Sequence, residues 1–538
     1  MSQRLCTIGI HGLTSIGQQF AAHHASSKTR VCISDEDPSF PDLVIGEYRN
    51  QTELDERDQH DVPLAERASR SMIGASGWKE LVQRVEHPRK IFVFGTYGDD
   101  EKFREVWDSL SSLLQRGDIV VRWGAEDGSD EIIHKFYTES VVENLSKEDA
   151  QDRGINLFEM IRLERDRVIV EKEDITEAFL IGGPKEAYET LKPLLQSYAA
   201  VGHAGNSAGC AHYASMIQRA IEFGVSQPYA EAAEMLRVVT NFVNQDFGRI
   251  MNNWNNGDLL PSYVLEISGK IYYKRDDLTP NGHIVNHMVD CVDLKDSDTW
   301  AAIEATKLGV PVPTLNAALE ARYFSVMKDD RVEASSILKS PTDTPVIFKD
   351  QAVDDLQKAI YCTIITAYAE GISILLAASE VESWDANITE CLRIWNHPGS
   401  FLVSNMLNKI MSACEKENFK HLLIDEEISA KLNELQMSWR RMPALAFCYG
   451  IPCPTFCASL TYYDSYRMKI MPIRLLRAQR DFFGGHGYER FDRDGYFSSC
   501  WTRDHTMQKK KRAAAEALEK EMADVQNERK RREKKDLS

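Results

Sequence analysis

The sequence lacks several features that would assign it to a specialised class of protein. Its 11 cysteines form no Cys-x-x-Cys pair, and Cys453 and Cys457 have no nearby histidine or cysteine that would complete a zinc site. No stretch approaches the roughly 18 uninterrupted apolar residues of a membrane span. The first apolar strand begins at Leu5, which leaves no room for a signal or transit peptide. We therefore expect reduced thiols, no metal, no membrane contact and a cytoplasmic location.

Basic residues are also scarce. The chain has 64 lysine and arginine residues against 82 aspartate and glutamate residues, a net charge of −18, which argues against a nucleic-acid surface over most of its length. Residues 503–538 are the exception: 12 basic residues against 8 acidic ones give +4 there, which leaves −22 for the rest. A length of 538 residues and an apolar fraction of 43% allow two or three globular domains with substantial cores.

The first 203 residues alternate between apolar strands and helical segments, which indicates a parallel sheet flanked by helices. Residues 5–17 contain a strand that runs into a glycine loop, and a helix follows. Further strands are expected at residues 30–34, 90–95, 118–124, 167–170 and 177–183. The polar residues 41–70 are predicted to form an exposed insertion in this Rossmann-like α/β domain.

From about residue 204 onward the apolar pattern becomes helical and predicts a large all-α domain. Helices are expected at residues 208–224, 229–248, 301–308, 314–327, 350–380, 389–416 and 426–447. The last segment, residues 503–538, is rich in alanine, glutamate and lysine with few periodic apolar residues, so we predict a single charged helix there.

Gly12 and Gly17 bracket the turn between the first strand and its helix, where glycine lets backbone N–H groups approach a pyrophosphate. Asp35 ends the second strand and could bind the ribose hydroxyls of NAD. Glu36 and Asp37 extend this acidic group, so the 2′-phosphate of NADP would meet three negative charges. The alternative is a retained Rossmann scaffold that binds no dinucleotide, and we expect no bound cofactor.

Several later segments resemble 6-phosphogluconate dehydrogenase. They are residues 309–335, 392–402, 439–467 and, most specifically, LLRAQRDFFGGHGYERFDRDG at 475–495. The resemblance covers residues 5–502 and implies a homodimeric enzyme of the pentose phosphate pathway that oxidatively decarboxylates 6-phosphogluconate with NADP. The implied parts are a Rossmann-like dinucleotide-binding domain (1–203), an all-helical family domain (204–478), the family's C-terminal segment (479–502) and an added basic tail (503–538).

Residues 211–224 read AHYASMIQRAIEFG, whereas the catalytic helix of the family reads GHFVKMVHNGIEYG. The resemblance places Ser215 at the general-base lysine, within a run from Pro193 to Gly269 that contains no lysine. An unassisted serine cannot take a hydroxyl proton at pH 7. His212, one turn earlier on the same helical face, is the alternative base.

The resemblance also locates other changes. Gln218 and Arg219 stand at a histidine and an asparagine of the catalytic helix, and Glu222 keeps the position of the general acid. Ala125 stands at an asparagine that follows the family's fourth strand, and nothing of a substrate-binding glycine loop remains near residues 164–166.

The phosphate-binding side is better preserved. The resemblance assigns contacts with the substrate phosphate to Lys295, Ser297, Arg322, Arg480 and His486, of which the last two act in the partner subunit's site. Phe223 replaces a tyrosine whose hydroxyl reaches the phosphate. Such a cluster could bind a sugar phosphate or another anion. Alternatively, Arg322 and Arg480 form ion pairs that stabilise the dimer.

These losses favour a catalytically inactive relative with a structural or regulatory role. The alternative is an active dehydrogenase that uses NAD or NADP with a replacement base. The basic tail could dock to an acidic partner such as RNA, tubulin or another protein, or fold back onto its own chain.

Overall fold

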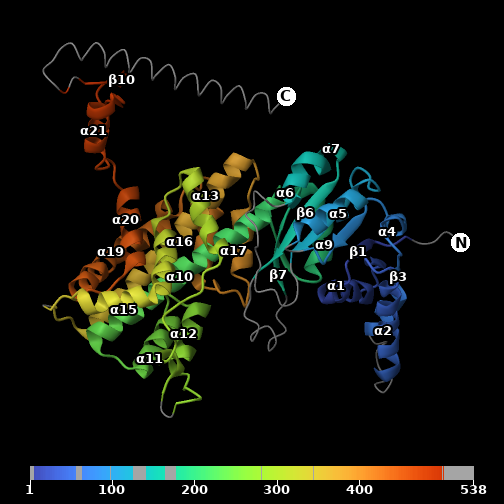
Figure 1. The fold of residues 1–538 in the computed structure, drawn as a ribbon, viewed down its shortest axis with the longest axis horizontal. Helices are drawn as coiled ribbons and strands as arrows, with labels where there is room; N and C mark the ends of the chain where they lie inside the picture. Colours follow the sequence, from blue (N-terminus) through green and yellow to red (C-terminus); the bar gives the residue numbers. More distant parts are fainter. Residues whose placement is uncertain are drawn as a thin grey trace. The chain divides into compact units, whose positions relative to one another are not determined.

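The computed structural model describes residues 5–55, 64–96, 99–124, 141–163, 177–279, 282–342, 344–499 and Trp501. The chain divides into two compact units, Met1–Tyr463 and Asp464–Ser538. The first unit contains both the α/β part and the helical part, which adjoin each other in Figure 1. The division between the units therefore falls earlier than the boundary after residue 478 that the sequence suggests.

An eight-stranded sheet forms the α/β part, in the order β3-β2-β1-β4-β5-β6-β7-β8. The strands are β1 (Ile8–His11), β2 (Val31–Ser34), β3 (Met72–Gly74), β4 (Lys90–Val93), β5 (Ile119–Gly124), β6 (Asn156–Arg162), β7 (Ala178–Gly182) and β8 (Ala200–Gly205). Neighbouring strands are parallel except for β6 and β7. This confirms the Rossmann-like fold class.

Four of the further strands expected after the first, at residues 30–34, 90–95, 118–124 and 177–183, are confirmed as β2, β4, β5 and β7. The strand expected at residues 167–170 lies outside the described residues. β3, β6 and β8 were missed because β3 is only three residues long, while β6 contains Glu159 and β8 contains glycines.

Helices cover this sheet. They are α1 (Ser15–Ser26), α2 (Phe40–Asp55), α3 (Leu64–Ser71), α4 (Trp78–Arg84), α5 (Asp100–Ser111), α6 (Val141–Leu145), the π-helix η2 (Ser146–Ala150), α7 (Gln151–Arg153) and α9 (Lys185–Gln196). The expected exposure of residues 41–70 is only partial among the described side chains: Leu43, Glu47 and Arg49 are exposed, whereas other residues enter the core. Val44, Ile45 and Ala68 are buried in the core of the α/β part, because α2 and α3 pack against each other and α3 packs on α1.

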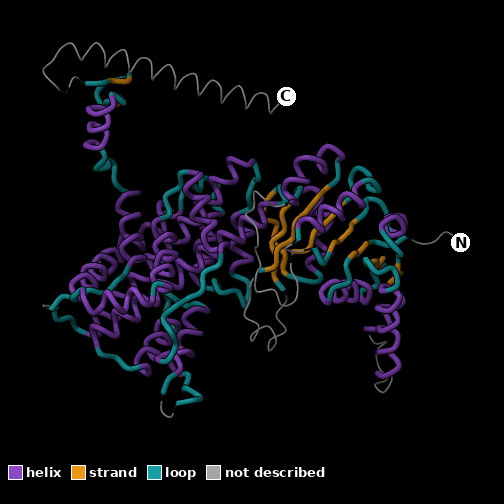
Figure 2. Tube along the Cα trace, viewed as in Figure 1, coloured by secondary structure: helices purple, strands orange, loops and turns teal. Residues whose placement is uncertain are grey.

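The rest of the first unit is helical, and Figure 2 shows the change from strand to helix. Its helices are α10 (Gly209–Thr240), α11 (Asn244–Asn255), α12 (Tyr263–Tyr273), η3 (Ile284–Asn286), η4 (Asp296–Thr299), α13 (Trp300–Leu308), α14 (Pro313–Val326), α15 (Lys328–Ile337), α16 (Lys349–Glu382), α17 (Ile388–Trp395), α18 (Asn405–Cys414), η5 (Leu422–Ile424), α19 (Glu426–Tyr449) and most of α20 (Pro454–Tyr466), which ends within the second unit. The expected large all-α region is confirmed.

Two of the expected helix boundaries are wrong. The helices expected at 208–224 and 229–248 merge largely into α10, which continues through Pro228 because most of its length is buried in the core. The single helix expected at 389–416 is instead α17 and α18, separated by a turn that contains Pro398 and Gly399. Proline and glycine disfavour a continuous helix at that position.

Two buried glutamates organise the helical part. Glu370 on α16 accepts hydrogen bonds from the backbone N–H groups of Thr314 (2.9 Å) and Leu315 (3.0 Å) at the start of α14. Glu231 on α10 accepts the corresponding bonds from Thr455 (3.1 Å) and Phe456 at the start of α20. Each carboxyl group thus satisfies N–H groups that a helix N-terminus leaves without intrahelical partners.

One described helix, α16, is long and apolar enough to cross a membrane, with a mean hydropathy of 1.6 in its most apolar window. That window is 89% buried inside the protein. Because a core helix of a soluble protein passes the same test, this feature is weak support for a membrane span.

The second unit contains α21 (Arg474–Gly484) and a hairpin of β9 (Tyr488–Glu489) and β10 (Tyr496–Phe497). The buried Asp481 carboxylate accepts hydrogen bonds from Gly487 N (2.9 Å), Ser498 Oγ (2.7 Å), Ser499 N (2.9 Å) and Trp501 Nε1 (2.7 Å). These bonds connect the helix to the hairpin within this unit and hold the pKa of Asp481 below its ordinary value. The tail expected at residues 503–538 lies outside the described residues.

Candidate catalytic and phosphate-binding site

The glycine loop has the close backbone packing expected of a Rossmann turn. Gly12 has φ +81°, and a Cβ atom there would lie 2.3 Å from the carbonyl oxygen of Phe94. A Cβ atom on Gly17 would lie 2.5 Å from the carbonyl oxygen of Gly12. Gly12 is therefore required by the close approach of the residue after β4, and Gly17 by the close approach of α1 to the loop, whether or not the loop binds a ligand.

The polar groups of this loop bind one another. Asp35 at the end of β2 accepts a hydrogen bond from Leu13 N at 2.6 Å. Thr14 Oγ1 accepts a hydrogen bond from Gly17 N at 3.2 Å and caps α1. Backbone N–H groups of this loop are the ones that a dinucleotide pyrophosphate would need. A carboxylate and a hydroxyl of the protein itself occupy two of them.

The acidic group after β2 fits NADP poorly. Glu36 forms an ion pair with Lys102 on α5 at 3.0 Å, so this lysine is already engaged by a carboxylate. Asp37 accepts hydrogen bonds from the Ser39 hydroxyl and backbone N–H. A 2′-phosphate placed here would be repelled by these carboxylates, and Lys102 and Ser39 already bind them.

Arg122 on β5 is a buried charged residue that the sequence patterns did not single out. Its guanidinium lies 3.0 Å from an Asp100 carboxylate oxygen, 3.4 Å from Glu159 on β6 and 2.6 Å from the carbonyl oxygen of Thr96. The only sequence signal was an arginine inside the apolar strand at residues 119–124. This network joins the carboxyl end of β5 to its neighbours, so it is part of the packing of the sheet.

The replaced residues on α10 all bind to groups of the chain itself. Ser215 is buried, and its hydroxyl donates to the backbone carbonyl of Ala211 one turn earlier at 3.0 Å. Gln218 Nε2 donates to Glu222 Oε1 at 3.0 Å, so an amide holds the retained carboxylate. His212, the alternative base, is buried with its ring centre 6.2 Å from that of Trp300.

Arg219 on α10 forms the clearest contact between distant segments in this site. Its Nε donates to Asp298 Oδ1 at 2.8 Å, and the exposed fractions of the two side chains are 20% and 3%. Asp298 lies in η4, and its other oxygen accepts a hydrogen bond from Lys295 N at 3.0 Å. Asp298 was not singled out from the sequence. Residues 295–300 read KDSDTW and resemble the family's KGTGKW segment, in which Asp298 stands at the second glycine.

Arg322 on α14 completes this cluster. Its guanidinium carbon lies 3.6 Å from the centre of the Phe223 ring, a stacked cation–π geometry. Burial lowers the pKa of Arg322, while the nearby carboxylates of Asp298 and Glu222 act in the opposite direction. The structure thus brings Glu222, Arg219, Asp298 and Arg322 into one partly buried charged cluster.

The remaining predicted phosphate residues are placed differently. Lys295 lies at this cluster and is half-buried. The side chain of Ser297, as well as Ala125 and residues 164–166, lies outside the described part of the chain. Arg480 and His486 are exposed residues of the second unit, and their contribution to a site remains a prediction.

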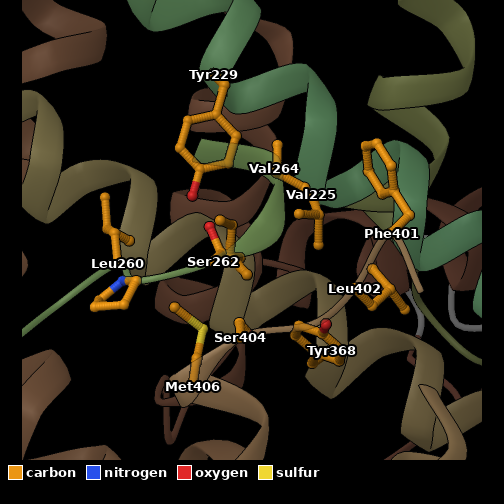
Figure 3. Close-up of a pocket in the computed structure, with 12 residues that line it drawn as sticks. Val225, Tyr229, Leu260, Ser262, Val264, Tyr368, Phe401, Leu402, Ser404 and Met406 are labelled. Carbon is orange, nitrogen blue, oxygen red and sulfur yellow. The ribbon is translucent and has the colours of Figure 1, made fainter. Parts of the chain in front are cut away.

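A small cavity lies within the helical part beside α10. It has a volume of about 10 Å³ and is lined by Tyr229, Ser262, Tyr368 and Ser404 among apolar side chains. Figure 3 shows the Tyr229 hydroxyl pointing toward Ser262, and burial raises the pKa of this tyrosine. The volume matches about one water molecule, so this cavity is too small for a sugar or a nucleotide.

The described residues hold no cluster of three or more histidine, cysteine, aspartate or glutamate side chains that could bind a metal ion. Cys453 Sγ and Cys457 Sγ lie 3.5 Å apart, and the described cysteines are free thiols. The reduced state of the thiols stays a prediction.

Comparison with known proteins identifies one family. Residues 211–501 match the family model described as 6-phosphogluconate dehydrogenase, C-terminal domain. The decarboxylating 6-phosphogluconate dehydrogenase of Synechococcus elongatus is 33% identical over 81% of this chain and 91% of that protein. The Escherichia coli enzyme is 31% identical over 83% and 92%. The structure of Plasmodium falciparum 6-phosphogluconate dehydrogenase, studied in apo form and with NADP+ and 6-phosphogluconate, matches with a TM-score of 0.75 at 27% identity, covering 92% of this chain and all of that one.

Proposed function

The chain belongs to the 6-phosphogluconate dehydrogenase family, and from this premise we propose that it is a catalytically inactive member with a structural or regulatory role. The observation that carries the proposal is Ser215 at the position of the general-base lysine. Oxidation of the substrate needs a group that accepts a hydroxyl proton near neutral pH. The Ser215 hydroxyl instead donates a hydrogen bond to the Ala211 carbonyl within α10.

The neighbouring replacements support the same proposal. In place of the histidine and asparagine of the family helix, Gln218 binds Glu222 and Arg219 binds Asp298. Both side chains thus bond groups of the chain itself, and Arg219 is bulky where the family has a small amide. The bond between Asp35 and Leu13 N supports the absence of a bound dinucleotide, because it uses an N–H of the glycine loop.

A second candidate function is oxidative decarboxylation of 6-phosphogluconate with NAD or NADP, as the names of the relatives suggest. Glu222 favours this candidate because it keeps the position of the general acid at the end of the replaced helix face. His212 would then be the first replacement base to test, since it lies one turn from Ser215.

We expect the protein to act as a homodimer. Exposed apolar side chains are numerous in both units: Phe324, Ile337, Leu338, Phe348, Leu475 and Phe483 are each more than 60% exposed. The resemblance implies a homodimer, and exposed apolar side chains of this kind are groups that a partner chain would cover. Analytical ultracentrifugation at micromolar concentration would test this, and a monomer at all concentrations would contradict it.

Two further expectations stay open to test. A cytoplasmic location would be checked by fractionation of cells that express the full chain. The basic residues 503–538 are proposed to dock to an acidic partner such as RNA or another protein. Unchanged co-purification after deletion of residues 507–538 would remove that proposal.

The deciding experiment for inactivity is steady-state reduction of NAD and NADP with 6-phosphogluconate at micromolar protein. We expect no rate above that of the Glu222→Ala variant, which serves as the matched control because it lacks the retained acid. A rate that Glu222→Ala abolishes would refute inactivity. His212→Asn and Ser215→Ala would then identify the base.

A further inference from the structure

Two positions of the candidate site hold a matched pair of charges. The family's catalytic helix has an asparagine where this chain has Arg219, and the KGTGKW segment has a glycine where it has Asp298. Both side chains are largely buried and bond each other directly at 2.8 Å. The two replacements therefore create one ion pair between α10 and the segment that resembles the family's phosphate-binding segment.

The Asp298 carboxylate lies among the groups that the resemblance assigns to phosphate binding. One oxygen bonds Arg219 Nε, and the other accepts the backbone N–H of Lys295. Asp298 and Glu222 are also the nearby carboxylates that oppose the lowering of the pKa of the half-buried Arg322 guanidinium. One arginine and one backbone N–H thus bond the carboxylate and a second arginine lies near it, a set of groups expected around an anionic ligand.

The charge balance of the cluster argues against a second anion. Asp298 and Glu222 supply two negative charges against the positive charges of Arg219, Arg322 and Lys295, so the excess positive charge left for a phosphate is reduced to a single charge. A phosphate dianion would have to approach a buried carboxylate, where repulsion is only weakly screened by water.

We propose that Asp298 is a built-in anionic occupant of the former phosphate subsite and that it excludes phosphorylated ligands. The carboxylate takes the place of the phosphate oxygens, and the Arg219–Asp298 pair fastens α10 to η4. Asp298 is thus a specificity-determining residue. The inference rests on the proposed function, since it explains how an inactive family member would also lose its substrate class.

Asp298→Asn tests this directly. The amide preserves the shape of the side chain and removes its charge, so inorganic phosphate and 6-phosphogluconate should bind this variant at least about 10-fold more tightly than wild type. Isothermal titration calorimetry measures both affinities. Asp293→Asn is the matched control, because it removes the same charge from an exposed site in the same segment.

Arg219→Asn/Asp298→Gly provides a second variant, because it restores both family residues and leaves no buried arginine without its carboxylate. Far-UV circular dichroism and the thermal midpoint establish that each variant is folded. Gain of phosphate binding in either folded variant, with Asp293→Asn unchanged, supports the proposal. Equal phosphate affinity in wild type and both variants overturns the proposal. The absence of phosphate binding in all three proteins overturns it as well.

The same samples separate the two proposals. NADP and NAD reduction by wild type would refute inactivity without bearing on the phosphate affinities. A wild-type protein that is inactive and yet binds phosphate as tightly as Asp298→Asn would overturn the role of Asp298 and leave inactivity standing.

Discussion

Glu370→Gln tests how the buried Glu370 carboxyl group makes the free energy of unfolding of the helical core depend on pH. Burial raises the pKa of Glu370 to about 8, above the ordinary carboxyl value of 4.5. Between these two pH values the folded protein keeps a proton that the unfolded chain has released. The stability linked to this group is therefore fully present below the ordinary pKa and is lost as pH rises toward 8, by roughly 1.4 kcal/mol per pH unit.

Glutamine resembles the protonated acid, because it is neutral and keeps one oxygen for the Thr314 and Leu315 N–H groups. Near pH 5 we therefore expect the free energies of unfolding of variant and wild type to agree within about 1 kcal/mol. Near pH 8.5 the wild type must bury an ionised carboxylate, and the variant should be the more stable by about 2–4 kcal/mol.

Urea unfolding followed by tryptophan fluorescence measures this difference across the pH range, and circular dichroism checks that the transitions coincide. Glu380→Gln is the control, since it removes an exposed acid from the same helix. A difference between Glu370→Gln and wild type that is independent of pH would refute the reasoning. A difference that grows in favour of wild type at high pH would show that the helix N-terminus stabilises the ionised form.

Three other outcomes follow from particular contacts. Gly12→Ala should destabilise the first unit by about 2–4 kcal/mol in urea unfolding, because its φ of +81° and the Phe94 carbonyl leave no room for a Cβ atom. Burial lowers the pKa of His24 to about 3, so stability linked to it is lost as pH falls below its ordinary value of 6.5, and His24→Gln should flatten this acid-side loss. Asp481→Ala should raise hydrogen exchange across residues 487–499 and leave the first unit unchanged, since Asp481 bonds Gly487, Ser498, Ser499 and Trp501.

The fold was largely predictable where a local pattern decides it. The apolar strands at residues 30–34 and 118–124 and the long helix at 350–380 carry their periodicity in consecutive residues, and all three form. Prediction failed where tertiary burial overrides composition. The polar segment after residue 40 was expected to be exposed, yet Val44 and Ile45 enter the core because α3 packs on α1.

The site divides in the same way. The loss of the lysine at Ser215 and the retention of Glu222 can be read from one helix of the sequence. The hydrogen bonding of the loop around Gly12 could not be read from the sequence. The bond from Leu13 N to Asp35 joins two turns that follow different strands. Glycines in the sequence suggested a ligand, whereas the structure shows that packing requires them.

By itself the sequence determined the family, the two kinds of architecture and the chemical types present at the replaced catalytic positions, because each is encoded in contiguous motifs. Only the tertiary structure decided which of those groups meet. Arg219 and Asp298 are separated by 79 residues in the chain and bond at 2.8 Å in the fold. A charge pair between distant segments leaves no local periodicity, so its existence emerges only when α10 and η4 are packed together.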